Sequence, residues 1–395
     1  MISKFLASLS NWKNRVAIKR LLKKKITISE INQYDLMILD DGYANLNFKN
    51  ICSFKIIKNE IFLQSLLRAF LKKIFSLKKI SNKSLSYLYL KDLLKTAKPK
   101  VIIGHDFKEN IFRIKKEFPE IFTIIYQFSD HDILNNKVIS KAIGPNLRSD
   151  EFNCDLYLSK HEVFNSIVNF INAKFLIIGS VKNNEIVIKK NDKYVYDIMM
   201  VSQYRPDVDA FSFNGIYNPK MLPIMDSALI FVTNILSNFC ENKKLKLCIA
   251  RTSSRKEKQD HIKKSDEEKF FSKILDQKNF YTEDTDSYQL AYKSKLVVTT
   301  YSTLGMELLS RGKKVLFIDP FYFLGGHIVN MLTDQQEGPY WYCGSDAKKI
   351  ESKIDHLLKI SNEEWREILK KSKLKMKYDP GNETLKEIIK TKIKN

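Results

Sequence analysis

Between residues 295 and 319 the apolar and polar positions alternate in a way that predicts a β-strand, a helix and a second β-strand. An apolar strand is expected at 296–299, and after a short polar turn an amphipathic helix is expected at 304–311. Gly312 is a helix stop signal, and a second apolar strand is expected at 315–318. The stretch therefore predicts a βαβ unit, the building block of a parallel α/β sheet.

The turn before this helix is suited to a phosphate group. The first N–H groups of a helix lack intrahelical partners and carry the positive end of the helix dipole, and Ser302 and Thr303 add hydroxyls there. Glu307 follows one helical turn later, where its carboxylate could accept two hydrogen bonds from a ribose diol. The residues indicate half of a nucleotide site, although an ordinary α/β crossover capped by Ser302 fits them equally well.

The same rhythm of strands and helices runs through most of the chain and predicts an α/β fold class. Residues 53–96 have a helical pattern, and strands follow at 98–106, breaking at Gly104, and at 122–132. Residues 181–194 have no helical period, and a new strand begins at 195, so we place a domain boundary near 182–195. Further helices are expected at 226–240, 345–359 and 361–376.

The length of 395 residues exceeds what one hydrophobic core usually serves. We therefore expect an N-terminal domain at 1–185, a C-terminal domain at 195–376 and a terminal helix at 377–395.

The formal charge of +22 comes mostly from lysine, since only ten of the 67 basic residues are arginine. The chain is also rich in Ile and Asn, and such a compositional bias is a weak sign of nucleic-acid binding, which we do not expect. An anionic membrane surface or a phosphate-bearing substrate accounts for the charge equally well. Two segments, 11–25 and 62–75, are both apolar and basic; each is expected to be a helix with a solvated basic face or packed on a sheet, with membrane contact as the alternative.

The five cysteines lie far apart without a C-x-x-C pair, which is typical of reduced thiols in a cytosolic protein. No uninterrupted apolar run is long enough to span a bilayer, and the N-terminus lacks the apolar core of a signal peptide. We expect a cytoplasmic protein that is soluble or peripheral on the cytoplasmic face of the inner membrane.

Polar residues follow the predicted strands of the first domain, at the edge where parallel sheets bind ligands. This edge is expected to carry His105, Asp106, Gln127, Asp130 and His131. Among the carboxylates, with Asp41 a further candidate, Asp106 is the preferred general base, since it directly follows a strand and Gly104 would let the backbone turn there. Each of these residues could instead be an ordinary loop residue.

The second domain offers a corresponding set of residues. Gln203 and Arg205 follow its first strand, and Arg251 and Arg255 follow the next. Arginine is scarce in this chain, and a planar guanidinium binds phosphate through two hydrogen bonds, so Arg251 is a candidate phosphate ligand. Surface charge is the alternative interpretation.

Several segments, in this order, resemble those of bacterial transferases that build lipopolysaccharide or capsule and have the GT-B fold. They are KPKVIIGHDFKENIF with IIYQ, FLIIGSVKNN, MMVSQYR, LKLCIARTSSR with DEEKFF, DSYQLAYKSKLVVTTYSTLGMELLSRGKKVLF, and EGPYW with SNEEW. The resemblance implies two Rossmann-like domains facing a central cleft, with a nucleotide sugar in the second and the acceptor glycan or glycolipid in the first. It implies that Glu307 binds ribose, that Ser302, Thr303 and Arg251 bind the diphosphate, and that Glu337 lies near the sugar.

The resemblance favours a glycosyltransferase that needs no metal and no cofactor beyond its nucleotide-sugar co-substrate. After IIYQ the related sequences have an Asn-Gly turn, whereas this chain has Phe128, Ser129, Asp130 and His131. Two D-x-D spellings, at 207–209 and 284–286, are expected to be solvated loops. A CDP-linked polyol-phosphate transferase of similar architecture, and a peripheral binding protein without activity, are the alternatives.

Overall fold

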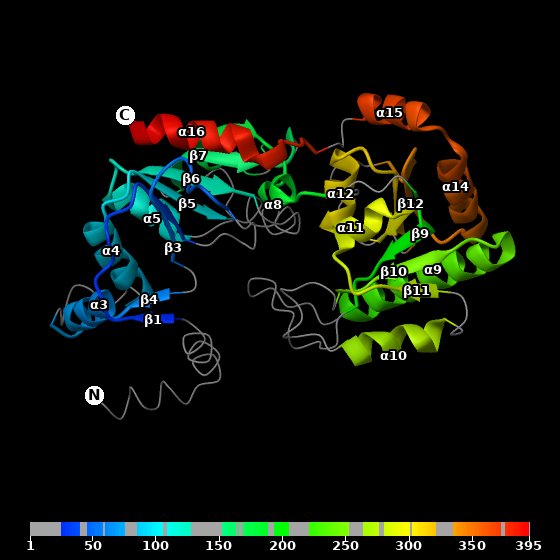
Figure 1. Ribbon diagram of the computed structural model, residues 1–395, viewed down its shortest axis with the longest axis horizontal. Helices are drawn as coiled ribbons and strands as arrows, with labels where there is room; N and C mark the ends of the chain where they lie inside the picture. Colours follow the sequence, from blue (N-terminus) through cyan, green and yellow to red (C-terminus); the bar gives the residue numbers. More distant parts are fainter. Residues whose placement is uncertain are drawn as a thin grey trace.

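Two largely parallel sheets form the centres of two α/β domains (Figure 1). The computed structural model describes residues 25–39, 46–57, 60–75, 85–105, 109–127, 152–162, 165, 168, 170–188, 193–204, 221–252, 264–275, 280–300, 302–320, 335–372 and 376–394. The strands of the first sheet all come before residue 178, and those of the second all come after residue 195. The boundaries at 185 and 195 remain our proposed division of the chain.

The first sheet has six parallel strands. In spatial order they are β3 (Phe54–Ile56), β2 (Leu36–Ile38), β5 (Val101–His105), β6 (Phe122–Tyr126), β7 (Asn153–Ser159) and β8 (Asn172–Ile177). A separate parallel pair, β1 (Lys25–Thr27) and β4 (Glu60–Phe62), lies beside it. The helices of the first domain include α3 (Leu63–Phe75), α4 (Leu85–Ala97) and α5 (Glu109–Glu117).

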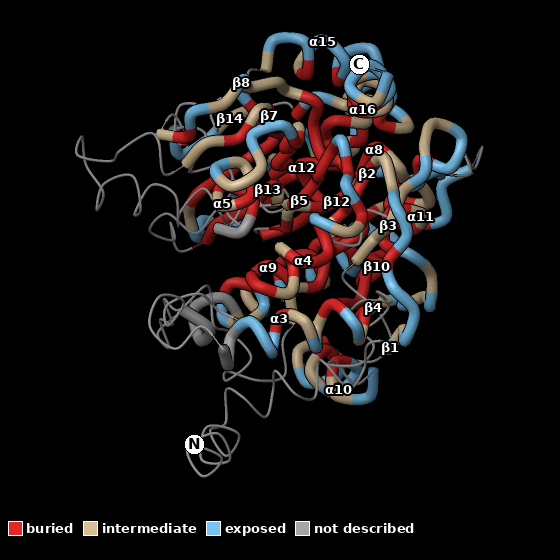
Figure 2. The backbone as a smooth tube through the Cα atoms, turned by 90° about the vertical axis from the view of Figure 1, so that its left-hand side faces the viewer, coloured by how far each residue is buried: buried red, intermediate tan, exposed pale blue. Residues whose placement is uncertain are grey.

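The second sheet has seven strands, parallel except for the final pair. In spatial order they are β11 (Phe280–Thr282), β10 (Leu247–Ala250), β9 (Tyr196–Val201), β12 (Ser294–Thr299), β13 (Val315–Asp319), β15 (Trp341–Cys343) and β14 (Glu337–Gly338). Its helices are α9 (Met221–Lys243), α10 (Lys264–Ile274), α11 (Ser287–Tyr292), α12 (Thr303–Ser310), α14 (Ala347–Lys359) and α15 (Asn362–Lys371). Buried residues run through the strands of both sheets (Figure 2).

The chain returns to the first domain at its C-terminal end. A short 3-10 turn, η4 (Pro380–Asn382), leads into α16 (Glu383–Lys394), which lies along the first sheet (Figure 1). Leu385 and Ile389 of this helix belong to the same buried cluster as Val101 and Tyr126 of the first sheet. Helices α4 and α5 contribute to the other clusters of this sheet, so it is covered on both faces.

The βαβ prediction is confirmed in β12, α12 and β13, whose ends lie within two residues of the predicted ones. The helical interpretation of 53–96 is wrong over 54–56 and 60–62, which are strands. Their three-residue length is too short for the surrounding helical pattern to reveal a change of period.

The prediction for 181–194 is also partly wrong, because Val181–Glu185 forms α8, capped by the Ser180 side chain. Gly104 does not break its strand: β5 continues through it and pairs it with Ile125. A Cβ there would lie 2.3 Å from Cδ1 of Ile111, so this glycine serves the close approach of α5 to the sheet.

Candidate functional site

The carboxyl ends of β10, β9, β12 and β13 lie side by side in the second sheet. Since neighbouring parallel strands end at the same edge, the residues that follow them form one surface, which we call the donor edge. It includes Ser202 after β9, Arg251 and Thr252 after β10, and Thr300 and Ser302 after β12. The sequence predicted this edge from strand ends alone.

Helix α12 presents its N-terminus to the donor edge. Ser302 is its N-cap: the Ser302 hydroxyl accepts a hydrogen bond from the Leu304 N–H at 3.3 Å. Its first turn has no acidic residue, so no side-chain carboxylate in that turn offsets the positive end of the helix dipole. A Cβ at Gly305 would lie 2.7 Å from both Phe317 and Thr299, so glycine allows α12 to pack this closely on the sheet.

Thr300 and Thr303 flank this helix start. The Thr300 side chain is buried, and its hydroxyl has no hydrogen-bond partner in the part of the chain that the structure describes. Thr303 is half-buried at the first position of the helix. Both hydroxyls are therefore close in sequence to the first N–H groups of the helix, where the positive end of the dipole favours an anion.

Glu307 lies on α12 at the junction between the two domains. Its Oε1 accepts a hydrogen bond from the Ser180 hydroxyl at 2.6 Å, and its Oε2 accepts one from the Tyr288 hydroxyl at 2.5 Å. Both donors are neutral hydroxyls, and all three side chains are buried. The carboxylate is therefore already engaged by two hydroxyl donors, the same chemistry that a ribose diol would offer.

Further contacts hold α8 against the C-terminal end of α12. The Asn183 amide donates to the Ser310 hydroxyl at 3.1 Å, and the Arg311 guanidinium donates to the Asn183 side chain at 2.6 Å and to the Ile186 carbonyl at 2.8 Å. We call this set, together with Ser180, Glu307 and Tyr288, the domain junction. It fixes the chain that leaves the first domain to the helix that carries the predicted ribose ligand.

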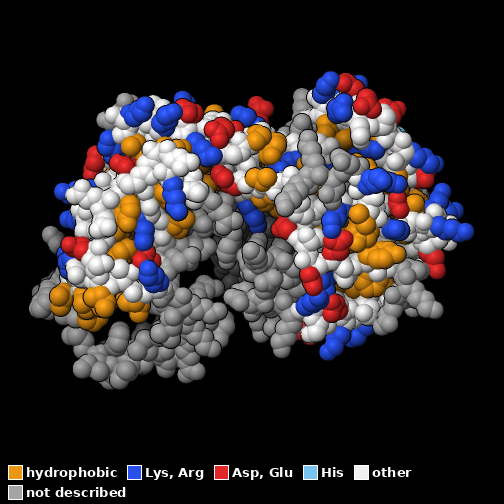
Figure 3. Space-filling view, in the orientation of Figure 1, with side chains coloured by type: hydrophobic (Ala, Val, Ile, Leu, Met, Phe, Trp, Pro, Cys, Tyr) orange, Lys and Arg blue, Asp and Glu red, His pale blue; other side chains and the backbone are white. Residues whose placement is uncertain are grey.

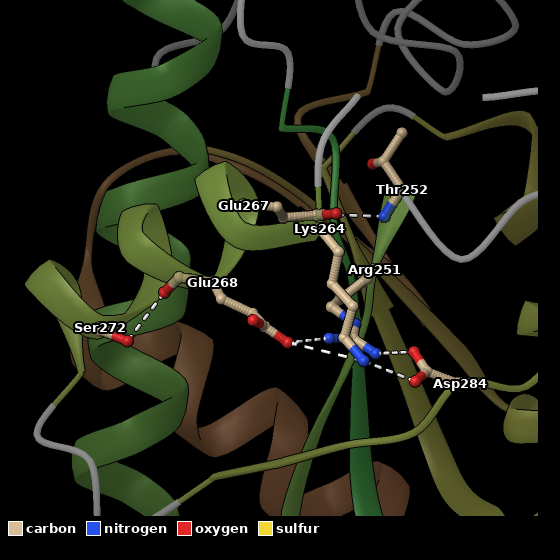
Figure 4. Close-up of polar contacts among 7 residues, drawn as sticks. All are labelled: Arg251, Thr252, Lys264, Glu267, Glu268, Ser272 and Asp284. Carbon is tan, nitrogen blue, oxygen red and sulfur yellow. Dashed lines mark hydrogen bonds and ion pairs between the residues drawn. The ribbon is translucent and has the colours of Figure 1, made fainter. Parts of the chain in front are cut away.

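Arg251 lies at the end of β10 with only 2% of its side chain exposed. Its guanidinium donates hydrogen bonds to the carboxylates of Glu268 and Asp284, which are 45% and 65% exposed (Figure 4). The Lys264 ammonium reaches Asp284 at 2.5 Å, and its hydrogen bond, together with the Arg251 charge, lowers the pKa of that carboxyl. We call these four residues the arginine cluster.

A buried carboxylate that the sequence analysis missed supports the donor edge. Oε1 of Glu267 on α10 accepts hydrogen bonds from the Ser202 hydroxyl at 2.5 Å and from the Thr252 N–H at 2.8 Å. The Thr252 hydroxyl donates to the Ser202 carbonyl at 2.9 Å. Glu267 thus ties the ends of β9 and β10 together. The segment DEEKFF was noted, but its two adjacent glutamates gave no sign that one is buried and the other exposed.

The other predicted donor residues lie in different settings. Gln203 is half-buried directly after Ser202, at the donor edge. Glu337 begins β14 at the end of the sheet, and a hydrogen bond from Lys349 at 2.7 Å lowers the pKa of its carboxyl. Arg205 and Arg255 lie outside the described residues.

At the first sheet, the predicted general bases Asp106, Asp130 and His131, together with Asp41, lie outside the described residues. Other residues at the same edge of the sheet are described. His105 ends β5, and the Gln127 side chain after β6 accepts a hydrogen bond from the Lys160 N–H at 2.9 Å. Lys160 is fully buried directly after β7, a position that the sequence analysis passed over.

Among the described residues no group of three or more His, Cys, Asp or Glu side chains is placed to hold a metal ion. The D-x-D at 284–286 lies in a loop with both aspartates exposed, as expected. Asp284 pairs with Arg251, and the Asp286 carboxylate caps α11 by accepting from the Tyr288 N–H at 2.9 Å. The stretch at 207–209 lies outside the described residues. No described helix has the length and apolarity to cross a membrane.

Two solved structures share the overall fold. The UDP-GlcNAc 2-epimerase of Neisseria meningitidis matches with a TM-score of 0.52 at 12% identity, covering 91% of this chain and 99% of that one. A protein described as a putative UDP-N-acetylglucosamine 2-epimerase of Listeria monocytogenes matches with a TM-score of 0.52 at 11% identity, covering 93% and 96%. Together with the two largely parallel sheets, each at the centre of an α/β domain, this likeness shows the GT-B fold.

Within that class, the chain belongs to a family described as "putative O-antigen biosynthesis protein", whose pattern matches residues 134–393. A comparison with curated proteins gives no significant match. The resemblance to surface-carbohydrate transferases of the GT-B fold is thereby confirmed.

Proposed function

We propose that this protein transfers a sugar from a nucleotide-sugar donor to a surface polysaccharide or lipopolysaccharide acceptor. The observation that carries the proposal is the donor edge, where the N-terminus of α12, which has no acidic residue in its first turn, and the buried Arg251 lie at the ends of β12 and β10. Membership of an O-antigen family agrees with a glycan acceptor.

The donor edge would hold the nucleotide by its charged and polar groups. Ser302, Thr303 and Arg251 would contact the diphosphate, and Glu307 would accept hydrogen bonds from the ribose. As the glycosidic bond to the donor breaks, negative charge grows on the leaving phosphate, and these fixed donors would stabilise it without a metal ion. Gln203, Arg205, Arg255 and Glu337 are the further donor-side residues of this proposal.

The acceptor would enter from the edge of the first sheet. An inverting reaction needs a base to remove the proton of the acceptor hydroxyl, and we assign this role to Asp106, which directly follows β5, with Asp130 and His131 as the alternatives. Gly104 gives no support to this choice, since the strand does not break there.

Calorimetric titration with UDP, GDP, CMP and CDP tests the donor site. We expect one nucleotide to bind more tightly than millimolar and Arg251→Ala to weaken it, while Arg366→Ala leaves it unchanged because that arginine pairs with the exposed Glu363 on α15. If none of the four binds, the donor assignment is wrong.

Product mass and turnover test the chemistry. Asp106→Asn should lower turnover by roughly 10²- to 10⁴-fold while nucleotide affinity stays the same. A product that gains a phosphate-bearing unit would identify a polyol-phosphate transferase instead. Epimerisation of UDP-GlcNAc without any acceptor would show that the chain shares more than its fold with the epimerases.

A further inference from the structure

Large apolar side chains gather on the outer surface of α3 and β1 (Figure 3). They are Ile26, Ile28, Leu67, Phe70 and Leu71, with exposed fractions between 41% and 74%. Figure 1 places this surface on the side of the first domain that is far from the second sheet. Single exposed apolar residues are ordinary, but five on adjoining elements are a sign of an interaction surface.

Helix α3 is fixed with this apolar side outward. Its opposite side buries Ser65 and Ala69 completely. Arg68 and Lys72 both form ion pairs with Asp92 on α4, at 2.8 and 2.9 Å. The buried small residues and the paired carboxylate hold the helix against α4, so the apolar side cannot turn inward without breaking these contacts.

Leu67, Phe70 and Leu71 are spaced three and four residues apart, so they form one stripe on α3. Ile26 of β1 and Ile28 just after it extend this stripe. An ion pair of 2.7 Å between Arg68 and Glu30 joins the helix to the chain just after β1. The apolar residues of both elements therefore belong to one surface, which we call the α3–β1 face.

Basic residues flank this face. Lys25 begins β1 with an exposed side chain. The Arg68 guanidinium and the Lys72 ammonium lie on α3, where both pair with Asp92, and Glu30 is the exposed acid among them. The sequence of residues 1–24, which leads directly into β1, contains seven Lys and Arg and no Asp or Glu. A strongly basic sequence thus directly precedes β1.

We propose that the α3–β1 face docks on an anionic lipid surface. The apolar stripe would enter the boundary between headgroups and acyl chains, and the basic residues around it would contact the anionic headgroups. Docking through this face would hold the first domain at the membrane. It is independent of nucleotide binding, which belongs to the donor edge of the other domain.

Flotation of the full-length protein with vesicles of phosphatidylglycerol and phosphatidylcholine, against vesicles of phosphatidylcholine alone, tests the proposal. The wild type should bind the anionic vesicles, and 0.5 M NaCl should weaken binding. A triple variant, Leu67→Ser with Phe70→Ser and Leu71→Ser, should bind them at least about tenfold more weakly. The matched control, Val187→Ser with Val195→Ser and Tyr281→Ser, changes equally exposed apolar residues elsewhere and should bind like the wild type.

Circular dichroism and nucleotide titration check that the triple variant is folded. Wild-type binding by the triple variant would overturn the proposal, as would equal binding to both kinds of vesicle. Loss of binding only when residues 1–24 are removed, with no effect of the triple variant, would assign membrane contact to that segment alone. Light scattering could instead show that the wild type is a dimer that binds no vesicles and that the triple variant is a monomer. That result would assign the face to contact with a second copy of the chain.

Discussion

The domain junction and the arginine cluster hold their central charged groups in opposite ways. Glu307 is a buried anion that accepts hydrogen bonds from two neutral, buried hydroxyls. Arg251 is a buried cation paired with two exposed carboxylates. A ligand phosphate would compete with charged groups at Arg251, whereas a ribose would meet only neutral donors at Glu307. On the proposed function, the comparison predicts that the contacts to the phosphate of the donor can adjust, whereas the contacts to its ribose are fixed.

Replacing Glu307 should have the largest effect of the changes within these two regions. Glu307→Ala removes two hydrogen bonds to a charged group and leaves the buried hydroxyls of Ser180 and Tyr288 without their acceptor. We expect nucleotide affinity to fall roughly 100-fold and the free energy of unfolding to fall by about 2–5 kcal/mol. Calorimetry and urea denaturation measure the two effects separately.

The double variant Ser180→Ala with Tyr288→Phe is the matched control for Glu307. It removes the protein donors and keeps the carboxylate, so it should destabilise the protein without lowering nucleotide affinity. A Glu307→Ala protein that loses stability and keeps its nucleotide affinity would show that Glu307 only braces the junction.

Removing the positive charge at the cluster should have a smaller effect. Arg251→Ala should lower nucleotide affinity by about 10- to 100-fold, the value of one charge-assisted contact to phosphate. Arg251→Lys should recover part of this loss, since it keeps the charge and loses the two-pronged geometry. Equal affinities for the lysine variant and the wild type would contradict a two-pronged contact.

Removing the competing carboxylates should reverse the sign of the effect. In the variant Asp284→Asn with Glu268→Gln, Arg251 loses its two charged partners. If a diphosphate competes with them, nucleotide affinity should rise a few-fold, and its dependence on salt should steepen. Lower affinity would mean that these carboxylates position Arg251 for the nucleotide.

The smallest expected effect is on the pH dependence of stability. Beside the junction, burial and the neighbouring charge of Lys314 lower the pKa of Lys313 to about 7. Between that pH and the ordinary pKa of lysine, the unfolded chain binds the proton that the folded chain has released, so stability should rise with pH over this interval. Urea denaturation from pH 7 to 10 should show this rise, and Lys313→Met should flatten it. The arginine cluster should affect stability at acidic pH instead. Protonation of Asp284 below its lowered pKa would remove the negative charge that pairs with Arg251 and so weaken the cluster.

Local patterns were sufficient to predict the donor edge. Strand β12, helix α12 and strand β13 follow from apolar spacing within 25 residues. Because the parallel strands of a sheet end at the same edge, Arg251 and Ser302 are then expected on one surface. The partners of these residues could not be found in this way. Ser180 is 127 positions away from Glu307, and only the packing of the two domains brings their side chains together.

The errors of the sequence analysis have physical causes. Gly104 was interpreted as a strand break, but a glycine also allows a helix to approach a strand closely, and the sequence does not distinguish the two. Helix α8 has five residues, too few to show a period of 3.6. Glu267 and Glu268 are adjacent and chemically identical, yet one is buried beneath the strand ends and the other is at the surface.

The return of α16 to the first sheet has a consequence for synthesis on the ribosome. Leu385 and Ile389 complete a core whose other members were translated hundreds of residues earlier. All strands of the second domain come before residue 344 and are therefore synthesised before α16, whereas the first domain must wait for α16 to complete its core. A chain that stops before α16 should therefore have a folded second domain and a first domain that is open to proteases.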